Sequence, residues 1–331
     1  MVLPDEAFVR KNERIGAPSC QLNIPQKKPN TFDAYIAIIF AKYTYTVIKL
    51  ASTYKQWTPI EHTVIKDAAL RQKLHEDGYA VVDFLSHEKL ERLVHFYRDR
   101  HQLDHSDGGM FYSLYSRDIS YRKEVHTFIG EEIKDALNSF FQDYENVINS
   151  YVVKAPGPKS AFYLHQDTTA LDEFKYSPLS VWIALQDTNS ENGCMNIIPK
   201  SHWLLSPYRG VTIPFPFKSI QEDIKAYLKP IHLQAGQALI FDNRLVHDSS
   251  LNQTEKDRIA IVSGIFPKEA EIITCYKSTD EKIELHKHQQ DYLHTHLKFY
   301  YDCHDRPTDS EVIDVIDNDF PAINFADFEN F

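Results

Sequence analysis

The 331-residue sequence has few cysteines and no long apolar run. Its 4 cysteines are widely separated and form neither a CxxC pair nor a zinc-ribbon spacing, which favours free thiols in a reducing compartment. The most apolar early stretch, residues 34–41, is too short to cross a bilayer, and no secretory signal is visible at the N-terminus. We therefore expect a cytoplasmic protein with no membrane segment.

The sequence also lacks an excess of positive charge. It has 36 Lys and Arg against 47 Asp and Glu, a formal net charge of −11. This balance argues against a nucleic-acid partner, because phosphate recognition needs a concentrated basic surface. The net charge does not exclude a local basic pocket that binds a phosphate or CoA group. With 43% hydrophobic residues, the chain can bury one large core with added helices, or two domains at most.

Three His-x-Asp patterns are present, and their contexts differ. His75 and Asp77 lie near the end of a helical pattern, where positions two apart point in different directions. The second pattern, residues 105–107, lies in a polar turn without rigid support. His165 and Asp167 close a strand-like run of aromatic and aliphatic residues, where alternation places both on one face. The third pattern is therefore the best candidate for a metal site.

His247 is the candidate third ligand. It follows the strand-like residues 238–242 and a short turn. Two imidazoles and one carboxylate can hold one face of an octahedral Fe(II) and leave the other positions open. We therefore predict that His165, Asp167 and His247 bind iron. The alternative interpretation is two hydrogen-bonded histidines and a turn aspartate.

Arg258 opens a further strand-like run, residues 258–263. A guanidinium forms bidentate hydrogen bonds to a carboxylate, so Arg258 is a candidate anion-binding residue. The alternative is a surface ion pair with Glu255 or Asp257.

The chain resembles the phytanoyl-CoA hydroxylase (PhyH) family of Fe(II)- and 2-oxoglutarate-dependent oxygenases over roughly residues 63–267. Beyond the His-x-Asp pattern, the resemblance is carried by an ordered series of motifs. They are Asp-Gly-Tyr-Ala-Val-Val at 77–82, Lys-Ala-Pro-Gly at 154–157, Leu-Ser-Val-Trp-Ile-Ala-Leu at 179–185, Asn-Gly-Cys-Met-Asn-Ile-Ile-Pro-Lys-Ser-His at 192–202 and Ala-Gly-Gln-Ala-Leu-Ile-Phe at 235–241.

The resemblance implies a mainly β protein with surrounding helices, built on a double-stranded β-helix, the jelly-roll or cupin-like barrel. It also implies that Arg258 and Ser249 bind the distal carboxylate of 2-oxoglutarate, with Trp182 lining that site and Gln166 close to it. Ser249 has turn chemistry as its alternative. The family's strand before Lys154 often supplies amide side chains to the cosubstrate.

Here the aligned positions are Ile148, Ser150 and Val152, so that role is not carried over. In related halogenases a small residue replaces the carboxylate. Because Asp167 is retained, hydroxylation is favoured over halogenation.

We expect three parts in the chain. Residues 1–60 form an arm and a helix, residues 61–275 the oxygenase domain, and residues 276–331 an extension with a possible helix and an acidic, aromatic tail. Helices are predicted over 32–56, 63–77, 88–100 and 131–146, a strand over 79–84, and mainly strands over 149–267.

Two segments, 168–178 and 206–216, are candidate loops at the mouth of the barrel, and loops often carry specificity. Tyr163, Asp172, Tyr176 and Arg209 are candidate substrate contacts, with packing or solvation as the alternative. Five histidines in the C-terminal part do not predict a second metal site, because two of them, taken as helical, would not share a face. They are His286, His288, His294, His296 and His304.

The predicted function is a dioxygenase that uses Fe(II), 2-oxoglutarate and O₂. It would hydroxylate an unactivated C–H bond of a small molecule, an amino-acid derivative or specialised metabolite, while 2-oxoglutarate is converted to succinate and CO₂. Desaturation, epoxidation, cyclisation and action on a peptide stay open, as does a non-catalytic jelly-roll sensor. The sequence does not predict the oligomeric state.

Overall fold

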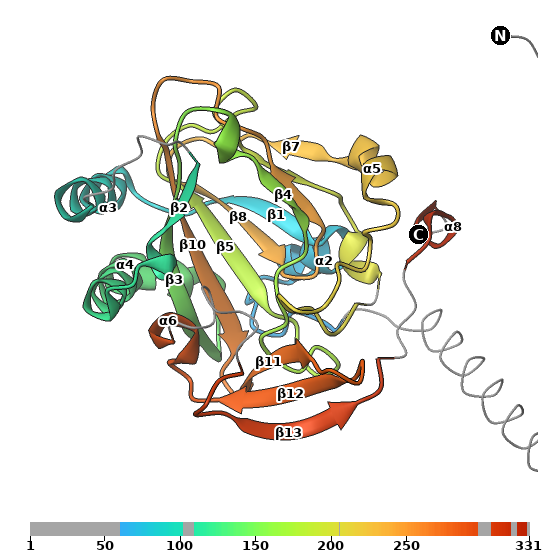
Figure 1. Cartoon of the computed structure of the whole chain (residues 1–331). Coiled ribbons are helices and arrows are strands. Elements are labelled where there is room, and N and C mark those ends of the chain that lie inside the picture. The colour runs from blue at the N-terminus through green and yellow to red at the C-terminus, as the bar shows by residue number, and fades with distance from the viewer. Residues whose placement is uncertain (1–59, 102–108, 205, 297–305, 319–322, 330–331) are drawn as a thin grey trace, which may run out of the picture. The chain divides into compact units, whose positions relative to one another are not determined.

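The computed structural model describes residues 60–101, 109–204, 206–296, 306–318 and 323–329 (Figure 1). The predicted N-terminal arm and helix, residues 32–56 and the pattern at 105–107 lie outside the described residues. In the part that is described, no helix has the length and apolar character needed to cross a membrane. Cys194 and Cys275 are buried free thiols.

Two antiparallel sheets form the centre of the fold (Figure 1). The large sheet has the order β1 (Tyr79–Asp83), β8 (Gln237–Asp242), β5 (Leu179–Ala184), β10 (Arg258–Pro267), β3 (Tyr144–Lys154) and β2 (Met110–Tyr112). The small sheet has the order β4 (Phe162–His165), β9 (His247–Ser249), β6 (Met195–Ile197) and β7 (Lys229–Ile231). The chain passes repeatedly between the two sheets, as in the predicted jelly roll.

The central strands β8, β5 and β10 of the large sheet bury both of their faces. In β5, Trp182 and Ala184 pack with Met195 and Ile197 of the small sheet, so this face lies between the sheets. Val181, from the opposite face, packs with residues of the helices. Strand alternation therefore divides one continuous apolar run between two cores.

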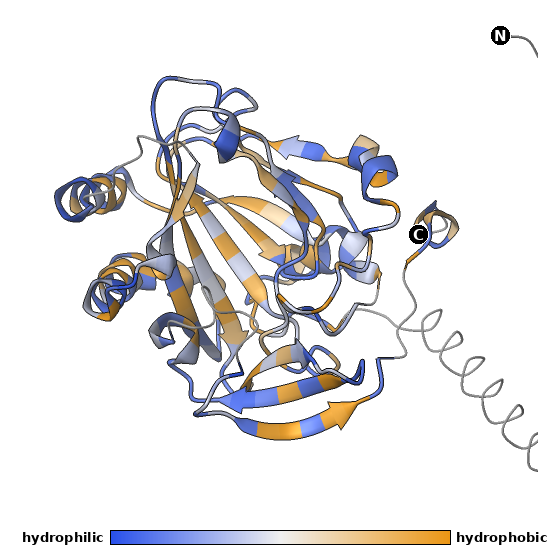
Figure 2. Ribbon diagram, viewed as in Figure 1, coloured by the Kyte–Doolittle hydropathy of each residue, from blue (hydrophilic) through white to orange (hydrophobic). Residues whose placement is uncertain are grey.

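Three helices cover the outer face of the large sheet, namely α2 (Ala68–Asp77), α3 (His87–Arg100) and α4 (Ile119–Phe140). Figure 2 shows that α3 and α4 turn apolar residues toward the sheet and polar residues outward. Side chains of Asp67 and Ser86 cap the first two helices, and Gly78 ends α2 with a φ of 83°.

The helix predicted over 131–146 has different bounds. Asp118 caps α4 through Ser120 and Tyr121, so the helix begins twelve residues before the predicted start. It ends at Phe140, and Asp143 then takes a φ of 47° before β3. The apolar spacing that predicted a helix as far as residue 146 therefore continued into the start of a strand.

A third sheet lies at the C-terminal end of the described chain, with the order β11 (Ile272–Lys277), β12 (Ile283–His288) and β13 (Glu311–Ile316). β11 runs through the predicted domain boundary at residue 275. The helical interpretation of His286 and His288 was wrong, because both lie in β12, where positions two apart share a face. The remaining short elements are η1 (Ser113–Tyr115), η2 (Pro158–Ser160), η3 (Ser201–Trp203), α5 (Gln221–Ile224), η4 (Lys225–Tyr227), α6 (Tyr292–Thr295) and α8 (Phe325–Glu329).

Candidate functional site

Two strands of the small sheet bring the predicted metal ligands together. β4 and β9 pair antiparallel, and His165 lies directly opposite His247. Asp167 follows the end of β4, and its Oδ1 lies 3.8 Å from His165 Nε2 and 3.9 Å from His247 Nε2. Among the described residues, these three form the only group of His, Cys, Asp or Glu side chains whose ligand atoms lie within 4.8 Å of one another.

Backbone carbonyls orient both imidazoles. His165 Nδ1 donates to the carbonyl of Tyr163, and His247 Nδ1 donates to the carbonyl of Leu245, each over 2.8 Å. A carbonyl only accepts hydrogen bonds, so each Nδ1 carries a proton and each Nε2 is turned toward Asp167. Burial and the neighbouring His247 hold the pKa of His165 well below its usual range. A neutral ring with its outer nitrogen already bonded is the form that ligates a metal.

Asp167 is held at its backbone and at its carboxylate. Its amide donates to the carbonyl of Asn243 over 3.0 Å, and its carbonyl accepts from Arg209 Nε over 2.7 Å. Ser180 Oγ lies 3.3 Å from one carboxylate oxygen and 2.9 Å from Asn243 Oδ1. The other carboxylate oxygen is the one that faces the two imidazoles.

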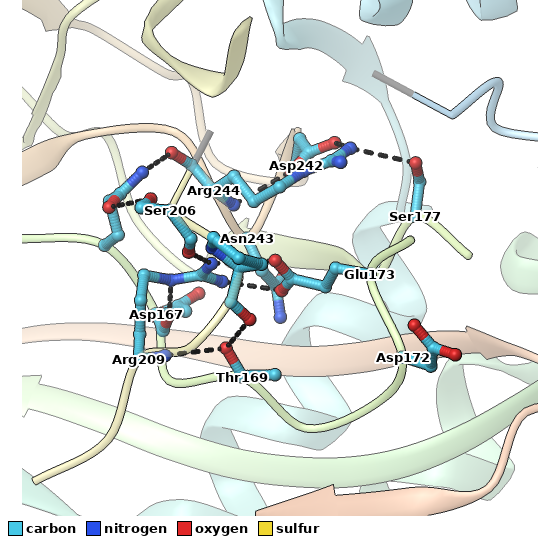
Figure 3. A network of polar contacts seen from close by, with 12 residues as sticks. Asp167, Thr169, Asp172, Glu173, Ser177, Ser206, Arg209, Asp242, Asn243 and Arg244 are labelled. Atoms are coloured by element: carbon cyan, nitrogen blue, oxygen red, sulfur yellow. Dashed lines mark hydrogen bonds and ion pairs between the residues drawn. The ribbon is translucent and has the colours of Figure 1, made fainter. Parts of the chain in front are cut away.

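A buried ion pair joins the two predicted mouth loops beside Asp167 (Figure 3). Arg209 donates to both carboxylate oxygens of Glu173, over 2.7 and 2.6 Å, and both side chains are buried. The Thr169 amide also donates to the Arg209 carbonyl, and the Thr169 hydroxyl accepts from the Arg209 amide. The loops 168–178 and 206–216 therefore form one connected surface next to the three ligands.

A small cavity of about 120 Å³ adjoins the three ligands and is lined by Arg258. The Arg258 side chain is only 1% exposed, which does not fit a surface ion pair. Its guanidinium carbon lies 4.9 Å from the centre of the Trp182 ring. Within the described residues, its Nε and Nη1 have no hydrogen-bond partner. Burial lowers the pKa of Arg258 to about 10, so the cation is retained at neutral pH without compensation.

Ser249 lines the same cavity, next to a lysine that carried no predicted role. Lys154 is fully buried, and its Nζ donates to Ser249 Oγ over 2.8 Å and to the carbonyl of Ser250. Lys154 also lies opposite Arg258 in the pairing of β3 with β10. Burial and the nearby Arg258 lower the pKa of Lys154 to about 7. The motif Lys-Ala-Pro-Gly contained this residue, but only the sheet register places it beside Arg258.

The other predicted cosubstrate residues divide between two cavities. Trp182 lines the small cavity, as does Val152, whose aliphatic side chain offers no hydrogen bond to a ligand there. Gln166 instead lines the larger cavity, donating to the carbonyl of Arg244 over 2.5 Å and accepting from Ser206 Oγ over 2.7 Å. Its amide is therefore used in holding the loops.

The larger cavity has a volume of about 490 Å³ and meets the small one at His165 and Asp167. His165, Asp167, Tyr112, Phe162 and Val262 line both. Tyr112, from β2, was not among the sequence candidates. Burial raises the pKa of its phenol, so the group is neutral.

The predicted substrate contacts have different positions. Tyr163 lines the larger cavity and is 71% exposed, whereas Arg209 lines it with its charge paired to Glu173. Asp172 forms a salt bridge with Lys175 over 2.8 Å, and Tyr176 packs against an apolar cluster. Neither Asp172 nor Tyr176 is among the residues that line the larger cavity.

The described C-terminal histidines are used in local contacts. His286 bonds to Ser310 over 2.8 Å, and His288 bonds to Thr274 over 2.7 Å. His294 stacks on His126 of α4, with the ring centres 3.9 Å apart. The first two contacts lie within the third sheet and its connections, and the stack of His294 on His126 joins α6 to α4.

The chain is similar to several curated proteins that are named phytanoyl-CoA dioxygenases. Phytanoyl-CoA dioxygenase 1 of Oryza sativa subsp. japonica is 28% identical over 137 residues, which cover 40% of this chain and 48% of that protein. Phytanoyl-CoA dioxygenase domain-containing protein 1 of Danio rerio is 32% identical over 120 residues, covering 33% of this chain and 40% of that protein. The chain thus matches about half the length, or less, of these curated relatives.

Two solved structures are also similar to this chain. One is the non-heme alpha ketoglutarate dependent carbocyclase SnoK from nogalamycin biosynthesis, with a TM-score of 0.47 and 19% identity over 65% of this chain and 89% of that one. The other is EctD from S. alaskensis with 2-oxoglutarate and 5-hydroxyectoine, with a TM-score of 0.44 and 16% identity over 65% and 81%. The family model described as phytanoyl-CoA dioxygenase (PhyH) matches residues 74–260, more than half of the chain.

Proposed function

The chain belongs to the phytanoyl-CoA dioxygenase (PhyH) family, and on that premise we propose that it is an Fe(II)- and 2-oxoglutarate-dependent dioxygenase. The proposed reaction is hydroxylation of an unactivated C–H bond of a small molecule. A cavity of about 490 Å³ at the ligands supports a small molecule over a peptide.

His165, Asp167 and His247 would hold the iron. Two imidazoles and a single carboxylate suit Fe(II) with open positions. When bound, iron with 2-oxoglutarate and O₂ supplies the oxidising power, and 2-oxoglutarate leaves as succinate and CO₂. The protein's contribution is to hold the ligands, orient both substrates and keep water out of the larger cavity.

The observation that carries the proposal is the unpaired Arg258. A buried cation without a partner is costly, and it is retained where a ligand supplies the missing charge. The cavity at Arg258 adjoins the three candidate ligands, and Ser249 offers a hydroxyl beside it. A small dicarboxylate with a metal-binding keto acid at its other end fits this arrangement of charge. Arg258 and Ser249 would bind its distal carboxylate, with Trp182 against it.

The first test is an anaerobic titration of the protein with Fe(II) and 2-oxoglutarate. We expect the weak visible charge-transfer band of the iron chelate in the wild type and its loss in His247→Ala. Asp77→Ala provides a matched control, since Asp77 belongs to the His-x-Asp pattern in α2, away from the three ligands. A band of normal strength in His247→Ala would remove the proposed centre.

Turnover separates an enzyme from a binding protein. Iron-dependent formation of succinate on addition of O₂ would support the dioxygenase, whereas a chelate band without any succinate would favour the sensor. The mass of the organic product then distinguishes hydroxylation, which adds one oxygen, from desaturation, which removes two hydrogens.

A further inference from the structure

We infer that the larger cavity takes a neutral, predominantly apolar molecule and rejects anionic ones. This inference rests on the proposed function, because it names the substrate class of the same site. If the substrate is an amino-acid derivative, the part of it that enters the cavity should carry no charge.

The wall of the larger cavity is mainly aromatic and aliphatic. It includes Leu114, Phe162, Val211, Ile213, Phe215 and Phe266. These side chains come from β2–η1, β4, the loop 206–216 and β10, so no single mobile element provides the apolar surface. Transfer of an apolar molecule from water into such a cavity is favourable in proportion to the area that it buries.

The cavity offers no free charge to a substrate. Apart from the candidate metal ligands His165 and Asp167, Arg209 is the only described lining residue of a charged type. Both Glu173 oxygens accept from its guanidinium, which also donates to the carbonyls of Asp167 and Ser206. The remaining polar side chains of the lining are of uncharged types, namely those of Tyr112, Tyr115, Tyr163, Gln166, Thr168, Ser180 and Asn243.

The two adjoining cavities therefore differ in charge. The small one contains the unpaired cation of Arg258, and the larger one contains a cation that Glu173 already neutralises. An anion that entered the larger cavity would lose its hydration without gaining a partner. A dicarboxylate would accordingly favour the small cavity and leave the larger one to the molecule that is oxidised. The difference in charge would therefore direct substrate and cosubstrate to different cavities when they bind, before any reaction takes place.

A matched pair of fluorescent probes tests the inference. The neutral probe is 1-anilinonaphthalene, and the anionic probe is 8-anilinonaphthalene-1-sulfonate, which adds a sulfonate to the same rings. Both are titrated into the full chain under anaerobic conditions with Fe(II) and saturating 2-oxoglutarate. We expect the neutral probe to bind at least about tenfold more tightly, because the sulfonate would be desolvated without a partner. A titration of Arg258→Met with Fe(II) but without 2-oxoglutarate removes the cation of the small cavity as an alternative site for the sulfonate.

Val211→Arg locates the probe. Val211 lines the larger cavity and is 49% exposed, so an arginine can be accommodated there without disrupting the core. The variant should bind the neutral probe more weakly and the anionic probe more tightly. Val312→Arg is the control, because Val312 is 52% exposed on β13 and does not line the cavity. It should keep the wild-type preference.

Three results would overturn the inference. They are equal or tighter binding of the anionic probe to the wild type, failure of the neutral probe to bind, and neutral-probe binding that Val211→Arg leaves unchanged. The chelate band recorded on the same samples reports separately on the proposed function. Loss of the band with an intact probe preference would refute the dioxygenase and leave the neutral cavity standing. An intact band without the probe preference would refute the neutral cavity and leave the dioxygenase standing.

Discussion

Two fully buried arginines near the site should respond in opposite ways to the same substitution. Arg244 donates to both carboxylate oxygens of Asp242, and the two side chains are 0% exposed. Arg258 is 1% exposed, with Nε and Nη1 unpaired. We predict that Arg258→Met raises the stability of the ligand-free protein, whereas Arg244→Met lowers it sharply.

The size of the effect follows from the cost of burying the charge. The lowering of the pKa of Arg258 to about 10 corresponds to roughly 3 kcal/mol against the charged form. The contact of the cation with Trp182 returns about 1 kcal/mol. Methionine keeps most of the packing against the ring, which leaves a net gain of about 2 kcal/mol, or about 4–8 °C in Tm. Because a lowered pKa penalises the protonated form, the gain applies fully at neutral pH and fades only as pH rises through about 10.

For Arg244→Met, an uncompensated Asp242 carboxylate stays buried, and we expect a loss of about 3–5 kcal/mol. Differential scanning fluorimetry measures both variants, with and without 2-oxoglutarate in the presence of Mn(II). At a 2-oxoglutarate concentration of about 100 times Kd, the wild type should gain about 2.7 kcal/mol and Arg258→Met close to none. The reasoning would be refuted by an Arg258→Met protein that is less stable than the wild type without ligand, or that is still stabilised by 2-oxoglutarate.

Three further predictions concern residues around the site. Lys154→Met should remove a rise in stability with pH above about 7. The folded pKa of Lys154 is lowered to about 7, so only the unfolded chain binds the proton there. Chemical denaturation at pH 7 and 9 measures this, and parallel pH profiles for variant and wild type would contradict it. Glu173→Gln should lower the free energy of unfolding by about 3–5 kcal/mol and weaken iron binding, because it leaves the Arg209 cation buried beside Asp167 without its partner. A thermal melt and an iron titration within error of the wild type would count against this prediction. Gly193→Ala should destabilise the protein and weaken 2-oxoglutarate binding. Its Cβ would lie 2.5 Å from the Ser250 carbonyl oxygen and 2.6 Å from Lys154 Cδ, at a φ of 78°. Unchanged melting and unchanged 2-oxoglutarate affinity would show that the backbone accommodates the methyl group.

The order of chemically distinctive residues along the chain was sufficient to predict the family and its jelly-roll fold. The His-x-Asp pattern in a strand-like run, the later His247 and the following Arg258 are far more specific as an ordered series than any one of them alone. Local signals also predicted helix ends. The helices predicted over 63–77 and 88–100 end at Asp77 and Arg100 in the structure, and the left-handed Gly78 follows the first, because such ends depend on adjacent residues only.

Apolar spacing alone was less reliable. It did not distinguish the end of α4 from the start of β3, since residues 141–146 continue the apolar pattern across a change of structure. Likewise, nothing near His286 and His288 indicated that they lie on β12, which pairs with β11 before it and with β13, a strand that begins only at Glu311. Long-range pairing decides such strands, and a local pattern does not contain it.

The sequence by itself determined which side chains were available for the chemistry, because residue type and order fix the candidate ligand set and the family. Only the tertiary structure decided which charges are compensated. It pairs Arg209 with Glu173 and Arg244 with Asp242, leaves Nε and Nη1 of Arg258 unpaired, and brings Lys154 beside Ser249. The cost of a buried charge depends on what surrounds it in space, and those neighbours come from distant parts of the chain.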